Sequence, residues 1–60
     1  MKRNLLLKEI RKCGAIFVRH GGKHDIYKNS KTGKIEQIPR HPDIEENLAR
    51  NIIKNLSKNI

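Results

Sequence analysis

Two closely spaced turn signals constrain what this chain can fold into more than any other feature of its sequence. The first is Gly21-Gly22 and the second spans residues 29–33, and both are rich in residues that accept turn geometry. The segments around them, residues 15–20, 23–29 and 34–38, carry the β-branched and aromatic side chains typical of strands. Turns this short cannot contain a crossover connection, so the sequence predicts a three-stranded antiparallel meander.

An amphipathic helix is predicted before the strands, over residues 4–13. Asn4 is placed to cap its start, and Gly14 is placed to end it because glycine tolerates a left-handed backbone. Its apolar stripe recurs with helical spacing at Leu6, Ile10 and Cys13. The basic side chains of this segment fall largely on the other side, so one face is suited to packing and the other to solvent.

A second amphipathic helix is predicted after the rigid, proline-containing connection of residues 39–42. Asp43 is expected to cap it, and the acidic first turn suits the positive end of the helix dipole. Its apolar positions are Ile44, Leu48, Ile52, Ile53 and Leu56, and cations follow at Arg50, Lys54 and Lys58. The predicted fold is therefore α+β, with the order α-β-β-β-α in one domain over residues 1–60, and with both helices on one face of the sheet.

The charge balance favours a polyanionic partner. The 60 residues contain 14 Lys and Arg against 6 Asp and Glu, which gives a net charge of +8 at neutral pH. Nucleic acid is the commonest partner for a protein with such a positive charge, and an acidic protein could bind to it as well.

The single cysteine, Cys13, excludes an intrachain disulfide and the spacings of a zinc finger. A reduced, cytoplasmic setting fits this usage. The apolar run at residues 5–7 is far too short for a signal sequence or a membrane span, so no membrane association is expected.

His24 is the strongest candidate for chemistry, since it follows Gly22 and Lys23 at the start of a predicted strand. An imidazole titrates near neutral pH and can both accept and donate a proton, which is what cleavage of a phosphodiester requires. In RNA the 2′-hydroxyl supplies an internal nucleophile, so a small protein needs only proton transfer and charge stabilisation. A histidine on a strand is nonetheless more often structural or solvent-facing.

Basic residues gather around the two turns and the proline connection, where they suit a phosphate-tracking patch. The residues predicted to contact RNA are Gly22, Lys23, Lys28, Arg40 and His41, with Lys31 and Lys34 in the same cluster. Ordinary solvated surface is the alternative for these cations.

Alternation along the strand places Asp25, Tyr27 and Asn29 on one face and His24 on the other, so Asp25 is not expected to orient His24. Tyr27 can stack on a base, but packing in the core is the more frequent role. A glycine turn separates His20 from His24, so the helical spacing of zinc motifs does not apply, and neither a metal nor another cofactor is expected.

Three stretches together resemble the HicA toxins, small ribonucleases of toxin–antitoxin pairs. They are Gly22-Lys23-His24-Asp25-Ile26-Tyr27, Ile38-Pro39-Arg40-His41 and Ile52-Ile53-Lys54-Asn55-Leu56. The resemblance implies a fold like the double-stranded-RNA-binding domain and cleavage of mRNA without a metal. It also implies that His24 is catalytic, because the family's histidine follows a glycine and one variable residue. Many members have Ser where this chain has Lys23, and a second histidine where it has Asp25.

The same resemblance implies a HicB-like antitoxin that covers the active site, with the toxin monomeric when free and part of a hetero-oligomer when inhibited. It leaves the second proton-transfer group open among Lys23, His41 and water. The main alternative is a double-stranded-RNA-binding module without catalysis, and a third is a structural component of a ribonucleoprotein.

Overall fold

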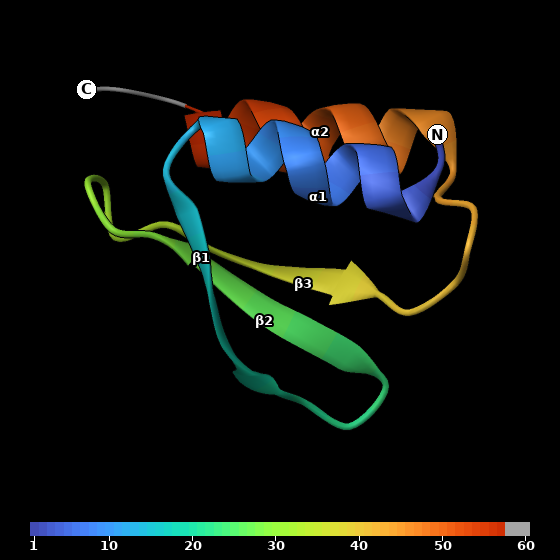
Figure 1. The fold of residues 1–60 in the computed structure, drawn as a ribbon, viewed down its shortest axis with the longest axis horizontal. Helices are drawn as coiled ribbons and strands as arrows, with labels where there is room; N and C mark the ends of the chain where they lie inside the picture. Colours follow the sequence, from blue (N-terminus) through green and yellow to red (C-terminus); the bar gives the residue numbers. More distant parts are fainter. Residues whose placement is uncertain (58–60) are drawn as a thin grey trace.

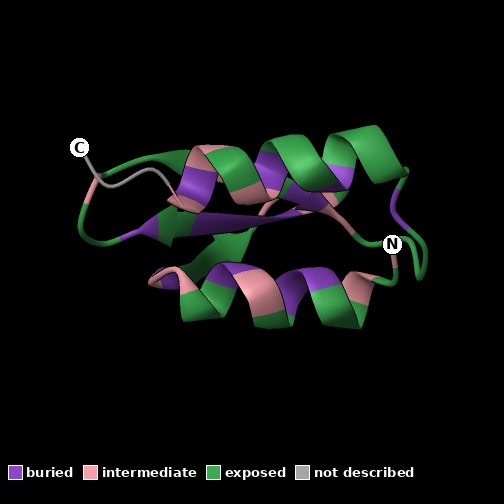
Figure 2. Cartoon of the chain, turned by 90° about the horizontal axis from the view of Figure 1, so that it is seen from above, coloured by how far each residue is buried: buried purple, intermediate pink, exposed green. Residues whose placement is uncertain are grey.

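The computed structural model describes residues 1–57 and has the predicted order α-β-β-β-α (Figure 1). Its elements are α1 (Arg3–Lys12), β1 (Ala15–His20), β2 (His24–Asn29), β3 (Ile35–Pro39) and α2 (Glu46–Ser57). The strands form one antiparallel sheet in the order β1-β2-β3, so β1 and β3 are its edges. The two helices lie side by side over one face of the sheet (Figures 1 and 2). The α+β prediction is confirmed.

The hydrophobic core lies between the helices and the sheet, where the facing sides of α1 and α2 are buried (Figure 2). Leucine and isoleucine provide most of it, and the fully buried large side chains are Leu6, Ile10, Ile38, Ile52 and Leu56. Tyr27 also packs into this core, which confirms packing as its position in the fold. Each such side chain contributes about 1.5–3 kcal/mol by its burial.

Helix α1 begins one residue earlier than predicted, at Arg3, and Asn4 does not cap it. The position before the helix is Lys2, which makes no capping bond with its side chain. Instead the backbone N–H of Arg3 donates to the carbonyl of Pro42 at 2.9 Å. A segment distant in sequence therefore satisfies the first N–H group of the helix. Gly14 ends the helix with φ of 100°, as predicted.

Helix α2 begins at Glu46, and the prediction that Asp43 caps it is wrong. Asp43 instead forms an isolated β-bridge with Lys2. The carboxylate of Glu45 accepts hydrogen bonds from the backbone N–H groups of Asn47 at 3.1 Å and Leu48 at 2.9 Å, and so caps the first turn. Leu48 is 42% exposed, whereas Ala49 is fully buried, so the apolar stripe is shifted there by one residue. Lys58 lies outside the described residues.

Strand β1 exposes Ile16, Phe17 and Val18, the side chains that marked this segment as a strand. The strand is an edge, and its register against β2 shifts between Phe17 and Arg19, as in a β-bulge. Strand β3 includes Pro39, one residue beyond the predicted end, which is compatible with the last position of an edge strand.

Asn29, at the end of β2, is fully buried and joins three parts of the fold. Its side-chain amide donates to the carbonyls of Cys13, at 3.1 Å, and Leu56. Its oxygen accepts from the backbone N–H groups of Lys31 at 2.8 Å and Thr32 at 3.3 Å. One side chain therefore fixes the ends of both helices against the β2–β3 turn.

Candidate functional site

Asp25 is the centre of a polar cluster at one end of the sheet. Alternation along β2 turns its side chain to the helix side, where it is only 12% exposed. Three other elements supply its partners: Nη2 of Arg3 at 2.7 Å, Nδ1 of His20 at 2.8 Å and Nε of Arg40 at 3.0 Å. A carboxylate this sheltered is stabilised because three donors compensate for its lost hydration.

The protonation states within this cluster follow from the partners of Asp25. The hydrogen bond from His20 is the largest influence and, together with Arg40, lowers the pKa of Asp25 from 3.8 to about 2, against the opposing effect of burial. The carboxyl is therefore ionised at neutral pH and has no proton to donate. Because it can only accept, Nδ1 of His20 carries the hydrogen between them. Nε2 is then the nitrogen left free on a neutral His20 ring.

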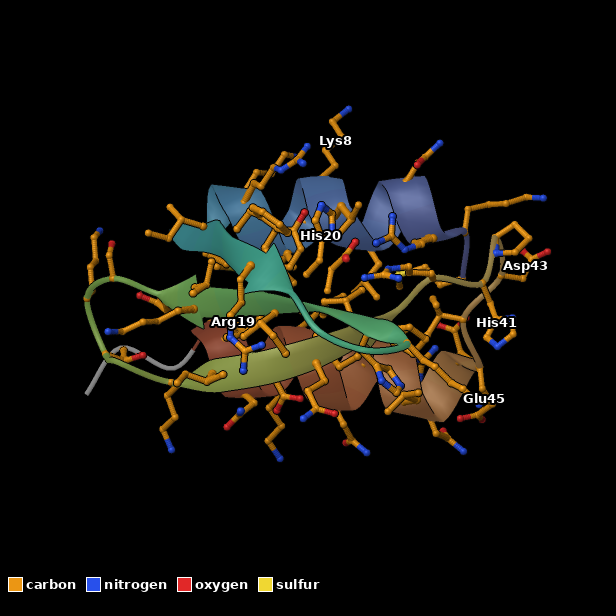
Figure 3. The ribbon with its side chains drawn as sticks, turned by 90° about the horizontal axis from the view of Figure 1, so that it is seen from below. Lys8, Arg19, His20, His41, Asp43 and Glu45 are labelled. Atoms are coloured by element: carbon orange, nitrogen blue, oxygen red, sulfur yellow. The ribbon has the colours of Figure 1, made fainter. Side chains whose placement is uncertain are left out.

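The His20 ring is held at its Nδ1 edge but open to solvent, with 73% of its side chain exposed. It lies on the side of β1 that faces α1 (Figure 3), and the Phe17 ring packs against it with the centroids 4.9 Å apart. A solvent-open hollow of about 630 Å³ adjoins it, lined by Arg3, His20, Gly21, Asp25 and Arg40.

Arg40 fixes the loop that joins β1 to β2. Its Nη1 donates to the carbonyl of Gly22 at 3.3 Å, and its Nη2 donates to the carbonyls of Gly21 at 3.0 Å and His24 at 3.5 Å. The backbone N–H of Gly21 closes the same loop by donating to the carbonyl of His24 at 2.7 Å. The guanidinium of Arg40 thus positions the loop that carries Gly22 and Lys23, in addition to binding Asp25.

The two loop glycines differ in what they permit. A Cβ on Gly21 would come within 2.9 Å of the His24 carbonyl oxygen, a backbone atom that cannot move aside cheaply. A Cβ on Gly22 would meet nothing within 4 Å. Gly21 is therefore required for closing the loop, whereas the space at Gly22 is open toward solvent.

His24 is half-buried at the start of β2, where it lies opposite Pro39 in the sheet. Alternation directs its side chain to the sheet face away from Asp25 and the helices, as the sequence predicted. Within residues 1–57 the imidazole of His24 has no hydrogen-bond partner among the side chains. Its backbone carbonyl is the common acceptor of Gly21 and Arg40, so the strand position of His24 is well defined.

The other residues predicted to contact RNA are placed around this loop. Lys23 is exposed in the loop, and Lys28 is exposed on β2, on the same sheet face as His24 by alternation. His41 projects from the connection after β3, at the end of the molecule where Asp43 lies (Figure 3). Gly22, His24 and Arg40 are brought together through the backbone of the loop; Lys28 and His41 lie farther along their segments.

The sequence prediction missed His20, Asp25 and Arg3 as a cluster. The structure pairs His20 with Asp25, which leaves residues 21–24 between the two partners. The predicted two-residue turn at Gly21-Gly22 would instead pair His20 with Lys23, so the sequence did not indicate this contact. Arg3 had no local signal either, because the approach of α1 to the sheet is tertiary.

This fold and cluster define a class: a small, basic α+β protein whose ionisable side chains surround one β-hairpin loop. The chain belongs to the HicA toxin family, since the family model described as "HicA toxin of bacterial toxin-antitoxin" matches residues 5–57. It is accordingly the toxin of a toxin–antitoxin pair, and an antitoxin is its partner.

The other two comparisons found no match, neither among curated proteins nor among solved structures. No helix in the described part of the chain is long and apolar enough to cross a bilayer. Across residues 1–57, no three His, Cys, Asp or Glu side chains gather in a metal-binding arrangement.

Proposed function

We propose that this toxin is an endoribonuclease that cleaves mRNA without a metal ion, and that His24 transfers a proton during cleavage. The observation that carries the proposal is membership of the HicA family over residues 5–57, a match that includes His24 and the loop before it. The imidazole stands at the start of a strand, half-exposed, next to Lys23. Attack by the 2′-hydroxyl on the adjacent phosphate needs only proton transfer and charge stabilisation, which such a site can supply.

RNA binding is assigned to the loop and the residues around it. Lys23 and Lys28 are exposed cations on either side of His24, and His41 and Arg40 follow β3. The open space at Gly22 lets the backbone of the loop approach a ribose or phosphate closely. Contacts of this kind track the RNA backbone and position it, and they carry little sequence information themselves.

The antitoxin is proposed to be a HicB-like protein that covers this loop and excludes RNA. With a net charge of +8, the toxin suits an inhibitor that presents carboxylates to it. Free toxin would then be a monomer, and the inhibited form a hetero-oligomer. Growth arrest on expression of the toxin should be relieved when the antitoxin is expressed with it.

The decisive experiment compares wild-type protein with His24→Ala. We expect the variant to lose cleavage of a short RNA by about 100-fold or more, the usual contribution of a positioned acid or base. Its melting temperature and its affinity for RNA should stay near those of the wild type, since the imidazole has no partner among the described side chains. Wild-type protein that binds RNA and never cuts it would instead establish the non-catalytic RNA-binding module.

A further inference from the structure

The face of the sheet opposite the two helices, here called the open face, is not covered by any part of residues 1–57 (Figure 1). Alternation along β2 and the register of its neighbours place seven side chains on this face: Ile16 and Arg19 of β1, His24, Ile26 and Lys28 of β2, and Ile35 and Gln37 of β3. Ile26 is buried and His24 is half-buried, whereas the other five are exposed. These side chains cannot pack against the helices, because the helices lie on the other side of the sheet.

A β-bulge in β1 places Arg19 on the open face. Phe17 pairs with Tyr27, which packs in the core, so this pair faces the helices. Regular alternation after Phe17 would turn Arg19 toward the helices and His20 away from them. The register shift between Phe17 and Arg19 reverses both directions, so Arg19 pairs with Ile26 and His20 joins the polar cluster on the helix side. Figure 3 views the sheet from its open side and shows Arg19 lying over the strands. Bulges often re-aim a side chain in this way beside a functional site.

Arg19 is also the arginine that the fold itself does not use. Its side chain is exposed, and within residues 1–57 its guanidinium has no hydrogen-bond or ion-pair partner. Each of the other four arginines donates to an acceptor of the protein: Arg3, Arg11, Arg40 and Arg50. The planar guanidinium of Arg19 can therefore bind an anion through two N–H groups, a geometry that matches phosphate.

Charges are segregated between the two faces of the sheet. The strands contain two acidic residues, Asp25 and Glu36, and both face the helices. Asp25 is bound there by two arginines, and Glu36 accepts a hydrogen bond from α2. The open face carries the cations Arg19 and Lys28 and no carboxylate from any of the three strands. This distribution favours an anionic ligand that lies across the open face, on the same side as the imidazole of His24.

We propose that an RNA strand runs along β2 on the open face, and that Arg19 binds the phosphate next to the one that is cleaved. The inference rests on the proposed RNA cleavage, and it names the surface and a binding residue that cleavage would use. His24, Ile26 and Lys28 follow one another at intervals of two residues, or about 6.6 Å, which is comparable with the step between phosphates of an extended RNA strand.

The register places Arg19 within reach of that neighbouring phosphate. Arg19 stands beside Ile26, so it is the diagonal neighbour of His24 across the two strands. Such positions are separated by about 7–8 Å, which a long side chain can span. Lys28 lies one step farther along β2 and would contact the phosphate after that. Arg19 is therefore a binding residue, and it does not touch the reacting atoms.

The first test measures RNA affinity without cleavage, in the His24→Ala background and with a short single-stranded RNA of mixed sequence. Arg19→Met keeps an unbranched side chain and removes its charge. One phosphate contact on a single strand contributes about 0.7 to the slope of log affinity against log salt. The slope should fall by about that amount, and the affinity should fall about 5-fold at about 0.1 M salt, with little loss near 1 M. Arg19→Lys should keep most of the slope, because it keeps the charge. Lys8→Met is the matched control, since Lys8 projects from α1 away from the sheet (Figure 3), and it should bind within about 2-fold of its parent.

A second pair of variants tests the open face without changing Arg19. Ile35→Glu places a carboxylate on the open face, whereas Leu48→Glu places one on α2, and the two native side chains are 57% and 42% exposed. Repulsion should weaken RNA binding about 5-fold or more in Ile35→Glu, and Leu48→Glu should bind within about 2-fold of its parent. Both should melt near their parent, because neither side chain is buried. This pair keeps the test decisive if Arg19→Met does not fold.

Cleavage gives a separate readout when His24 is present. Because Arg19 would hold substrate and transition state alike, Arg19→Met should raise KM about 5-fold and leave kcat near that of the wild type. A fall in kcat with KM unchanged would overturn the assignment of Arg19 to a neighbouring phosphate.

The remaining outcomes separate this inference from the proposed function. If Arg19→Met and Ile35→Glu bind RNA as tightly as their controls, RNA does not lie on the open face and the inference is wrong, while cleavage by the wild type still upholds the proposed function. If both variants lose affinity for the antitoxin alone, the open face is an antitoxin surface and the inference is wrong in the same way. Wild-type protein that binds RNA through Arg19 but never cuts it would refute the proposed cleavage and support the RNA-binding surface.

Discussion

The most demanding test of the fold is the replacement of Asn29 by alanine. Alanine removes the two donors that satisfy the carbonyls of Cys13 and Leu56, and the acceptor for two N–H groups in the β2–β3 turn. The backbone N–H groups in this turn can form hydrogen bonds with water instead, since Lys31 is exposed. The carbonyl of Leu56 is buried and that of Cys13 is partly buried, and each unsatisfied buried group costs about 1–3 kcal/mol. We therefore expect a loss of about 3 kcal/mol in the free energy of unfolding.

That loss is large for a chain of this size. At about 0.05–0.15 kcal/mol per residue, 60 residues have a total stability of roughly 3–9 kcal/mol. Asn29→Ala should therefore be partly unfolded at room temperature. Urea denaturation followed by far-ultraviolet circular dichroism measures the change, with all variants made in a His24→Ala background to avoid toxicity.

Two further variants sharpen the experiment. Asn29→Asp keeps the oxygen that the turn uses but places a negative charge against two carbonyl oxygens, so it should be at least as destabilising near neutral pH. Asn51→Ala, at an exposed position of α2, is the matched control and should change stability by less than about 0.5 kcal/mol. A change below about 0.5 kcal/mol in Asn29→Ala would refute the reasoning, because it would show that the carbonyls find other partners at no cost.

Three further predictions concern the loop, pH and the antitoxin. Gly21→Ala should lower the melting temperature because its Cβ meets the His24 carbonyl at 2.9 Å, while Gly22→Ala should melt like the wild type; equal melting would contradict the geometry. The pKa of Asp25 is about 2 in the fold against an ordinary 3.8, and the Met1 amino group and Arg50 hold the pKa of Glu46 below 4.5. Both carboxylates therefore stabilise the fold above their unfolded pKa and lose that contribution as pH falls, so the urea midpoint should drop between about pH 5 and pH 2. A midpoint independent of pH over that range would count against both contacts. Association with the antitoxin should slow as salt rises from about 0.05 to 0.5 M, as measured by stopped-flow mixing; salt-independent rates would exclude electrostatic steering.

The element order was predictable because it depends on local signals. Turn residues at Gly21-Gly22 and 29–33 divided the strands, and the helical spacing of Leu6 and Ile10 marked the first helix. The helix starts were not predictable to the residue. Pro42 and Glu45 supply the groups expected from Asn4 and Asp43, and the first of these depends on how the chain returns to its own beginning.

The candidate site divides in the same way. The alternation that separates His24 from Asp25 was available from the strand pattern and agrees with the structure. The pairing of His20 with Asp25 depends on a strand register with four residues between the partners, where a two-residue turn was predicted. The approach of Arg3 depends on the packing of α1. Strand register and helix packing depend on residues far apart in the sequence, so no local motif in this chain predicted these two contacts.

The cluster around Asp25 also has a consequence for the order in which the toxin folds as it is made. The contacts of Asp25 with Arg3 and Arg40 span 22 and 15 residues of sequence, so they belong to the slow, non-local part of folding. A nascent chain that has reached only β2 holds both histidines but lacks the guanidinium that fixes their loop. The contacts of Arg40 with Asp25 and with the loop can form only after the segment beyond β3 has left the ribosome, so this end of the sheet is completed late in synthesis.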